Sequence, residues 1–185
     1  MDRKQIPNGI TIIRLILILP VIFSLLIKQY EWTFYLFMLA GVSDALDGFL
    51  ARRYQWTSRF GAIVDPVADK SLMTLTYLAL GYLGHLPLWL VGIVIGRDLI
   101  IIIGAIVYKY MIEEPAFAAT FISKLNTVLQ MSLVVFILFN QVYDIIPEKI
   151  LEIGMYVVAS TTVSSLLDYV WIWGRRAWLI KRVKT

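Results

Sequence analysis

The stretch DALDGFLARRYQWTSRFGAIVDPVAD, residues 44–69, carries four aspartates within an otherwise apolar chain. Carboxylates at hydrocarbon depth are costly, which indicates a functional role. Residues three or four apart share a helix face, so Asp44 and Asp47 are predicted to project together. Asp65 and Asp69 have the same spacing, and two such helices facing each other bring four carboxylates to one place. Because bare carboxylates repel one another at low dielectric, the pattern predicts bound cations or raised pKa values.

The residues around the aspartates fit phosphate chemistry. Four oxygen ligands suit a hard divalent ion, so we expect Mg²⁺ or Mn²⁺, and two ions rather than one. Gly48 and Gly61 leave room for a nucleotide near the backbone, and Arg52 or Arg53 neutralises phosphate oxygens. Asp65-Pro66 is typical of an N-cap followed by proline, which predicts that the second helix starts there. The alternative is four unrelated aspartates solvated at helix ends.

Composition places the chain among integral membrane proteins. Apolar residues make up 59% of the sequence and the mean hydropathy is +0.77. Residues 1–185 are expected to form a single domain, without room for a separate soluble module. The lack of cysteine excludes disulfides, thiolate metal sites and cysteine nucleophiles. The net charge of +4 comes from basic residues that flank apolar runs, and no nucleic-acid motif is present, so no nucleic-acid partner is expected.

Hydropathy predicts an all-α integral membrane protein with six transmembrane helices, each of about twenty residues. The expected spans are 10–27, 32–50, 61–83, 87–108, 122–139 and 150–173. The first is long for a signal peptide and no small-x-small cleavage site follows it, so it is expected to be retained. Short connections predict antiparallel neighbours.

The distribution of lysine and arginine predicts the orientation. Twelve of these residues fall on one side of the expected bilayer: Arg3, Lys4, Arg52, Arg53, Arg59, Lys109, Lys124, Arg175, Arg176, Lys181, Arg182 and Lys184. The other side has only Lys28 and Lys149. By the positive-inside rule both termini are cytoplasmic, and the aspartates form a cytosol-facing active-site cavity. A soluble nucleotide reaches that cavity from the cytosol, and a lipid's tails stay in the bilayer. We expect the bacterial inner (plasma) membrane.

The aspartate pattern, D-x2-D-G-x2-A-R-x8-G-x3-D-x3-D, resembles the signature of the CDP-alcohol phosphatidyltransferase family at all eight fixed positions. Residues 6–14, IPNGITIIR, resemble the family's I-P-N-x-x-T-x-x-R run, which packs beside the nucleotide site. The resemblance covers nearly the whole chain. It implies that CDP-diacylglycerol is bound with its diphosphate held by the metals, and that an acceptor hydroxyl attacks the lipid-linked phosphorus with CMP leaving.

The resemblance also implies residue roles. Asp44, Asp47 and Asp65 are metal ligands, and Asp69 is both a ligand and the catalytic base that deprotonates the acceptor. The CDP-diacylglycerol site is expected to contain Asn8, Thr11, Arg14, Asp44, Asp47, Gly48, Ala51, Arg52 and Gly61. For Arg14 the alternative is snorkelling to the interface.

The acceptor alcohol is the finer question. Candidate acceptor-binding residues are Lys70, Arg97, Lys124 and Asn126. Arg97 lies deep in the fourth span, where it either pairs with Asp98 in a structural network or contacts substrate or the aspartates. Lys124 and Asn126 open the fifth span, either at the acceptor or as a snorkelling lysine and a helix cap.

Residues 121–130, FISKLNTVLQ, look more like cardiolipin synthases of eukaryotic type than like phosphatidylglycerophosphate synthases, which more often have G-K-x-K-T there. Asn126 stands where their second lysine would be, and losing that cation weakens binding of a doubly charged phosphate. We therefore expect phosphatidylglycerol as the acceptor, with glycerol 3-phosphate as the alternative. Small enzymes of this type are often homodimers by resemblance. A cation-coupled transporter is a remote alternative, because transporters place such charges at the midplane of several helices.

Overall fold

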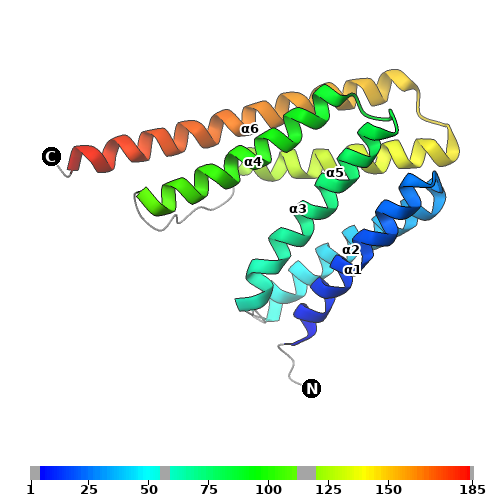
Figure 1. Cartoon of the computed structure of the whole chain (residues 1–185), viewed down its shortest axis with the longest axis horizontal. Coiled ribbons are helices and arrows are strands. Elements are labelled where there is room, and N and C mark those ends of the chain that lie inside the picture. Colours follow the sequence, from blue (N-terminus) through cyan, green and yellow to red (C-terminus); the bar gives the residue numbers. More distant parts are fainter. Residues whose placement is uncertain (1–4, 55–58, 112–119, 184–185) are drawn as a thin grey trace. The chain divides into compact units, whose positions relative to one another are not determined.

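The described part of the chain is helical apart from short connections (Figure 1). A computed structural model describes residues 5–54, 59–111 and 120–183, and the side chains of 15–43, 70–107, 120–172 and Arg175. These ranges contain six helices: α1 (Gln5–Leu26), α2 (Tyr30–Tyr54), α3 (Arg59–Tyr82), α4 (Leu88–Met111), α5 (Phe121–Tyr143) and α6 (Glu148–Val183). Each predicted span therefore overlaps one helix, which confirms the all-α class.

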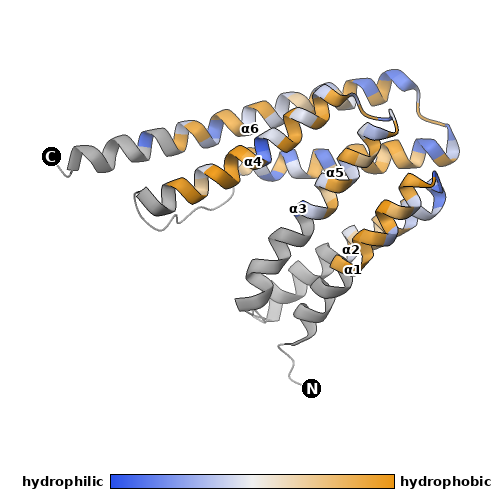
Figure 2. Ribbon diagram, viewed as in Figure 1, coloured by the Kyte–Doolittle hydropathy of each residue, from blue (hydrophilic) through white to orange (hydrophobic). Residues whose placement is uncertain are grey.

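Three helices are long and apolar enough to cross a membrane, over Leu88–Val107, Phe121–Tyr143 and Glu148–Ile172. Figure 2 shows apolar residues along α4 and along the described part of α1. Large apolar side chains on α4, including Leu99, Ile103 and Val107, are exposed in the isolated chain. Exposed apolar residues along a whole helix are expected where the surroundings are lipid rather than water. The fold is thus that of a helical membrane protein.

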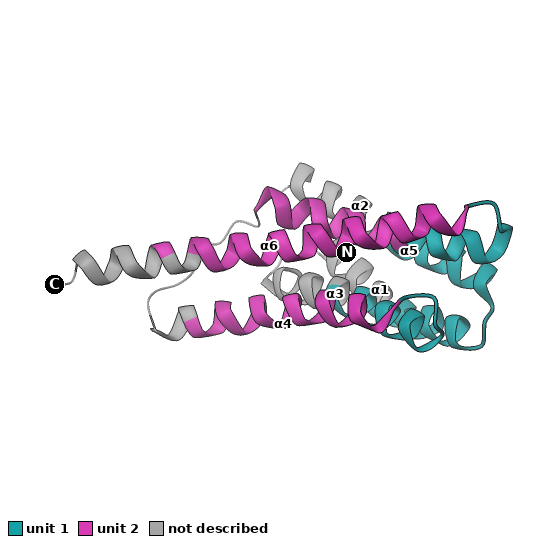
Figure 3. Cartoon of the chain, turned by 90° about the horizontal axis from the view of Figure 1, so that it is seen from above, with its two compact units in different colours: residues 1–86, 134–146 teal, residues 87–133, 147–185 magenta. Residues whose placement is uncertain are grey.

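The chain divides into two compact units (Figure 3). Unit 1 comprises residues 1–86 and 134–146, and unit 2 comprises residues 87–133 and 147–185. In unit 1, α1 packs against both α2 and α3. Fully buried apolar side chains form the core of this unit, among them Val21, Leu25, Phe37, Tyr77 and Leu80. Burying each such side chain contributes about 1.5–3 kcal/mol relative to exposure to water, which drives the packing before lipid is considered.

Two tight connections in unit 1 meet at one end of its helices. Lys28, between α1 and α2, has a φ of 61°, and Gly84, between α3 and α4, has a φ of 80°. Glycine suits this left-handed conformation because it has no Cβ. The Tyr30 hydroxyl lies 2.9 Å from His85 Nε2, so the two connections are joined by a hydrogen bond. The short loops predicted at both places are confirmed.

In unit 2, α4 packs against α6. Trp89 stacks on Tyr156 with ring centroids 5.8 Å apart. A Cβ at Gly154 on α6 would lie 3.2 Å from Leu133 Cδ1 on α5, so glycine permits a close approach of the two helices there. Small residues at such crossings are typical of packing in membranes.

One predicted helix boundary was wrong. Asp65-Pro66 does not start α3, which begins six residues earlier at Arg59. The residues just before Asp65 are apolar or glycine and continue the helix, and proline is tolerated inside membrane helices. The expected last span, 150–173, agrees with the apolar stretch Glu148–Ile172, and the helix that contains this stretch, α6, continues to Val183. Its 36 residues span about 54 Å against a hydrocarbon core of about 30 Å, and hydropathy detects only the apolar part.

Candidate functional site

The aspartate motif lies on two consecutive helices of unit 1. Asp44 and Asp47 are in the second half of α2, and Asp65 and Asp69 are in the first half of α3. At 1.5 Å per residue, Asp47 lies about 10 Å before the end of α2 and Asp65 about 9 Å after the start of α3. Asp44 and Asp69 both lie about 15 Å from those ends. Along their helices, Asp47 and Asp65 therefore lie at similar distances from the link between α2 and α3. Asp44 and Asp69 form a second such pair, farther from the link.

The helix α1, which carries Asn8, Thr11 and Arg14, packs against both α2 and α3. One unit therefore holds the three helices that carry the predicted nucleotide and metal residues. The side chains of these predicted residues lie outside the described part of the structure: Asn8, Thr11, Arg14, Asp44, Asp47, Gly48, Ala51, Arg52, Gly61, Asp65 and Asp69. Their roles as ligands and base stay predictions.

The donor chemistry of the motif fits a hard divalent ion, because carboxylate oxygens are the ligands that Mg²⁺ and Mn²⁺ prefer. Where the structure describes side chains, no group of three or more histidine or acidic residues lies together. The described side chains therefore offer no second place for such an ion, and the motif stays the metal site that we expect.

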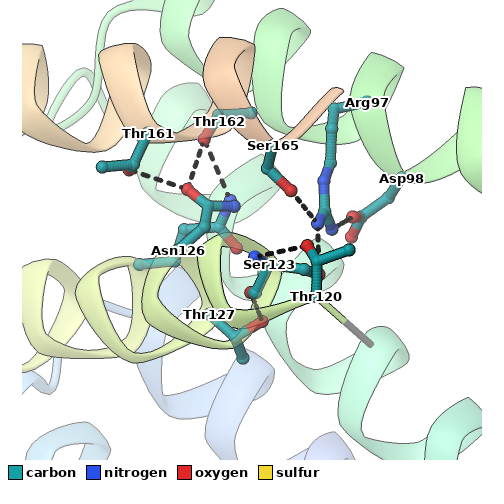
Figure 4. Close-up of polar contacts among 10 residues, drawn as sticks. Arg97, Asp98, Thr120, Ser123, Asn126, Thr127, Thr161, Thr162 and Ser165 are labelled. Carbon is teal, nitrogen blue, oxygen red and sulfur yellow. Dashed lines mark hydrogen bonds and ion pairs between the residues drawn. The ribbon is translucent and has the colours of Figure 1, made fainter. Parts of the chain in front are cut away.

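A second polar cluster lies within unit 2, and here the side chains are described (Figure 4). We call it the polar seam, and it comprises Arg97 and Asp98 of α4, Ser123, Asn126 and Gln130 of α5, and Thr161, Thr162, Ser165 and Tyr169 of α6. The α5 members recur at intervals of three and four residues, as do the last three members of α6, so each set lies on one helix face. Apart from the half-buried Thr161, these side chains are buried.

Arg97 uses both terminal nitrogens within the protein. Its Nη1 donates to Asp98 Oδ1 at 2.6 Å, and its Nη2 lies 2.7 Å from both Ser123 Oγ and Ser165 Oγ. The guanidinium carbon lies 5.9 Å from the centroid of the Tyr169 ring. A buried charge needs such partners because it has lost its water. The pairing of Arg97 with Asp98 is confirmed, and the structural network is the alternative that these contacts favour.

Asn126 is fully buried between α5 and α6. Its Oδ1 accepts hydrogen bonds from Thr161 Oγ1 at 2.9 Å and from Thr162 Oγ1 at 2.8 Å. Gln130 Nε2 donates to Thr162 Oγ1 at 3.3 Å, which extends the seam along α5. Two buried nitrogens in the seam, Arg97 Nε and Asn126 Nδ2, have no hydrogen-bond partner in the described structure.

The other predicted acceptor residues lie outside the seam. Lys124 is exposed at the start of α5, where Thr120 caps the helix by accepting from Ser123 N at 3.2 Å. Lys70 is half-buried on α3 in unit 1. The structure thus places Arg97 and Asn126 in two separate hydrogen-bonded groups of the seam, and Lys124 stands next to Ser123 in the chain.

The α6 members of the seam, and the roles of Ser123 and Gln130, were not predicted from the sequence. Their signal was present, because polar residues at helical spacing inside an apolar span predict a buried polar face. Serine and threonine gave a weak signal, since each can satisfy its hydroxyl on its own helix, as exposed Ser160 does with Tyr156 O at 2.8 Å.

The fold and motif define a class, namely helical membrane proteins with an acidic motif on two consecutive helices. The model of one family, described as CDP-alcohol phosphatidyltransferase, matches residues 4–167. The chain belongs to this CDP-alcohol phosphatidyltransferase family.

Individual relatives carry two different names. A probable cardiolipin synthase (CMP-forming) of Drosophila melanogaster is 30% identical over 181 residues, which cover 89% of this chain and 56% of the relative. The human cardiolipin synthase (CMP-forming) is 33% identical and is 60% covered. A CDP-diacylglycerol–glycerol-3-phosphate 3-phosphatidyltransferase of Sodalis glossinidius is 31% identical, with 91% of this chain and 94% of the relative covered. The chain thus spans little more than half the length of these two cardiolipin synthases.

Proposed function

We propose that the protein transfers the phosphatidyl group of CDP-diacylglycerol to an alcohol and releases CMP in phospholipid biosynthesis. The observation that carries the proposal is the eight-position motif, set at matching distances along α2 and α3 in a chain of this family. Binding of one or two divalent ions, Mg²⁺ or Mn²⁺, by the four aspartates would neutralise the diphosphate and stabilise the leaving group.

The residues of the motif divide the remaining work. Asp69 accepts the proton of the acceptor hydroxyl while the hydroxyl oxygen bonds to the lipid-linked phosphorus, and the bond from that phosphorus to CMP breaks. Arg52 neutralises phosphate oxygens, and Gly48 and Gly61 leave room for the cytidine diphosphate. Asn8, Thr11 and Arg14 approach the same ligand from α1, which is supported by the packing of α1 on both motif helices.

We propose phosphatidylglycerol as the acceptor, which makes the product cardiolipin. Two observations support this choice: relatives over 89% of the chain bear the name cardiolipin synthase, and the neutral Asn126 replaces a second lysine. Glycerol 3-phosphate is the second candidate. It is favoured by the match in length to the Sodalis relative, whose name contains that substrate.

We further propose that all six helices cross a bacterial plasma membrane and that both termini are cytoplasmic. The lopsided lysine and arginine count supports this orientation, and an even number of crossings returns the chain to its starting side. A homodimer is proposed by family resemblance.

Purified protein in detergent, given labelled CDP-diacylglycerol and a divalent ion with each acceptor in turn, tests the activity. We expect CMP release, with cardiolipin as the main product and phosphatidylglycerol as the preferred acceptor. Formation of phosphatidylglycerophosphate alone would establish the second candidate. Transport of a cation without CMP release would replace both with the transporter hypothesis.

A further inference from the structure

The two ends of the Asn126 amide have different surroundings. The oxygen end accepts two hydroxyl hydrogen bonds from α6, whereas the nitrogen end has no partner among the described residues. The side chain is fully buried, so bulk water does not supply the missing partner. Buried amide donors are nearly always paired in folded proteins. The N–H₂ group is therefore a buried donor that is unused within the described part of the chain.

The second unpartnered nitrogen of the seam is also a donor. Arg97 Nε and Asn126 Nδ2 are the buried side-chain atoms without partners in the described structure, and neither can accept a hydrogen bond. Because both are donors, a ligand that pairs with either nitrogen must offer acceptor oxygens. Hydroxyl and phosphodiester oxygens have this property.

Thr162 determines which end of the amide faces α6. Its Oγ1 receives a hydrogen bond from Gln130 Nε2 and has Asn126 Oδ1 as the acceptor for its own proton, at 2.8 Å. Thr161 differs, because its proton has two backbone acceptors in addition to Asn126: Val157 O at 3.0 Å and Val158 O at 3.1 Å. The orientation of the amide therefore depends more on Thr162 than on its neighbour.

We propose that Thr162 is a positioning residue for acceptor selection. It holds Asn126 Oδ1 toward α6, so that the amide N–H₂ group donates to a hydroxyl or phosphodiester oxygen of the acceptor head group. The amide is neutral, so it binds such an oxygen but adds no positive charge to the site. A doubly charged acceptor such as glycerol 3-phosphate would need that positive charge. The inference rests on the proposed function, and it adds α6 to the residues that choose the alcohol.

Kinetics of Thr162→Val, which keeps the shape of the side chain but loses the hydroxyl, test the proposal. We expect the KM for phosphatidylglycerol to rise about fivefold, the effect of losing one oriented hydrogen bond. The kcat and the KM for CDP-diacylglycerol should change less than about twofold, a split that general loosening of the fold would not produce. Thr162→Ser keeps the hydroxyl and should restore the acceptor KM. Ser160→Ala removes an exposed hydroxyl of α6 outside the seam and serves as the matched control.

A second variant keeps the proposal testable if Thr162→Val does not fold. Asn126→Asp retains the size of the side chain but offers acceptors at both ends, so the acceptor KM should rise at least as much as in Thr162→Val. If the wild-type protein is active and the folded variants keep its KM for the acceptor, the inference is overturned and the proposed function stands. An equal effect on both substrates would also overturn the inference. Wild-type protein that releases no CMP with either acceptor would overturn the proposed function and, with it, the inference.

Discussion

At the scale of single residues, Asp69 is the group on which the proposed chemistry depends. Asp69→Asn should lower kcat at least about 100-fold, because an amide cannot take the proton of the acceptor hydroxyl. Binding of CDP-diacylglycerol should weaken far less, since three aspartates of the motif remain. CMP release and retention of labelled CDP-diacylglycerol are the two measurements. Asp168→Asn, at a half-buried carboxylate of α6 outside the motif, is the control, and near-normal turnover by the Asp69 variant would rule out its role as base.

We expect Arg97 to contribute to the stability of the fold through its buried contacts. Arg97→Met should destabilise the fold by about 3 kcal/mol, because it removes the buried ion pair with Asp98 and the hydrogen bonds to the Ser123 and Ser165 hydroxyls. The double variant Arg97→Met, Asp98→Leu should lose less than the sum of the single losses. Equilibrium unfolding in detergent measures these differences, with Ser164→Ala as the exposed control. A fully additive result would contradict the coupling inferred from the 2.6 Å pair.

His85 gives the connection between α3 and α4 a dependence on pH. Burial and the nearby Lys28 charge lower the pKa of His85 below its usual range, so folding favours the neutral ring that faces Tyr30. The unfolded chain then binds more protons, and stability is full above the unfolded pKa of about 6.5 and falls at lower pH. We expect a loss of a few degrees in Tm between pH 7.5 and pH 5.5. His85→Gln should flatten this part of the profile, and an unchanged slope would contradict the assignment.

At the scale of helices, the motif on α2 and α3 should need a divalent ion. If the four carboxylates of these two consecutive helices meet as proposed, they repel one another and a diphosphate unless cations compensate them. Excess chelator should therefore reduce CMP release to background, and added Mg²⁺ or Mn²⁺ should restore it. Full turnover in chelator would contradict the metal proposal. When Mg²⁺ or Mn²⁺ is added back in increasing amounts, Asp44→Asn should need a higher metal concentration than the wild type for half-maximal activity.

The helices were predictable where hydropathy and length decide the structure, which is why all six expected spans contain a helix. Helix boundaries that depend on local chemistry were not predictable in this way. Asp65-Pro66 is typical of a helix start, but the apolar residues before it extend α3 back to Arg59. The pairing of Arg97 with Asp98 was among the alternatives because a deep charge needs a partner. Its bonds to Ser123 and Ser165 were not predicted, since they join helices far apart in sequence and no local pattern specifies which faces meet.

At the scale of the whole molecule, six crossings and the basic residues predict opposite sides for two connections. The link between α2 and α3 should be cytoplasmic, because Arg52, Arg53 and Arg59 surround it. The connection between α5 and α6 should be external, where Asn140 Oδ1 accepts from Ile146 N at 2.7 Å and shapes the turn. The natural chain has no cysteine, so single cysteines at Thr57 and Gln141 give clean probes in intact cells. An impermeant thiol reagent should label Gln141→Cys from outside and should label Thr57→Cys only after the membrane is opened. Equal labelling from outside would mean that the lysine and arginine asymmetry does not set the orientation, and the proposed access of the nucleotide from the cytosol would fail with it.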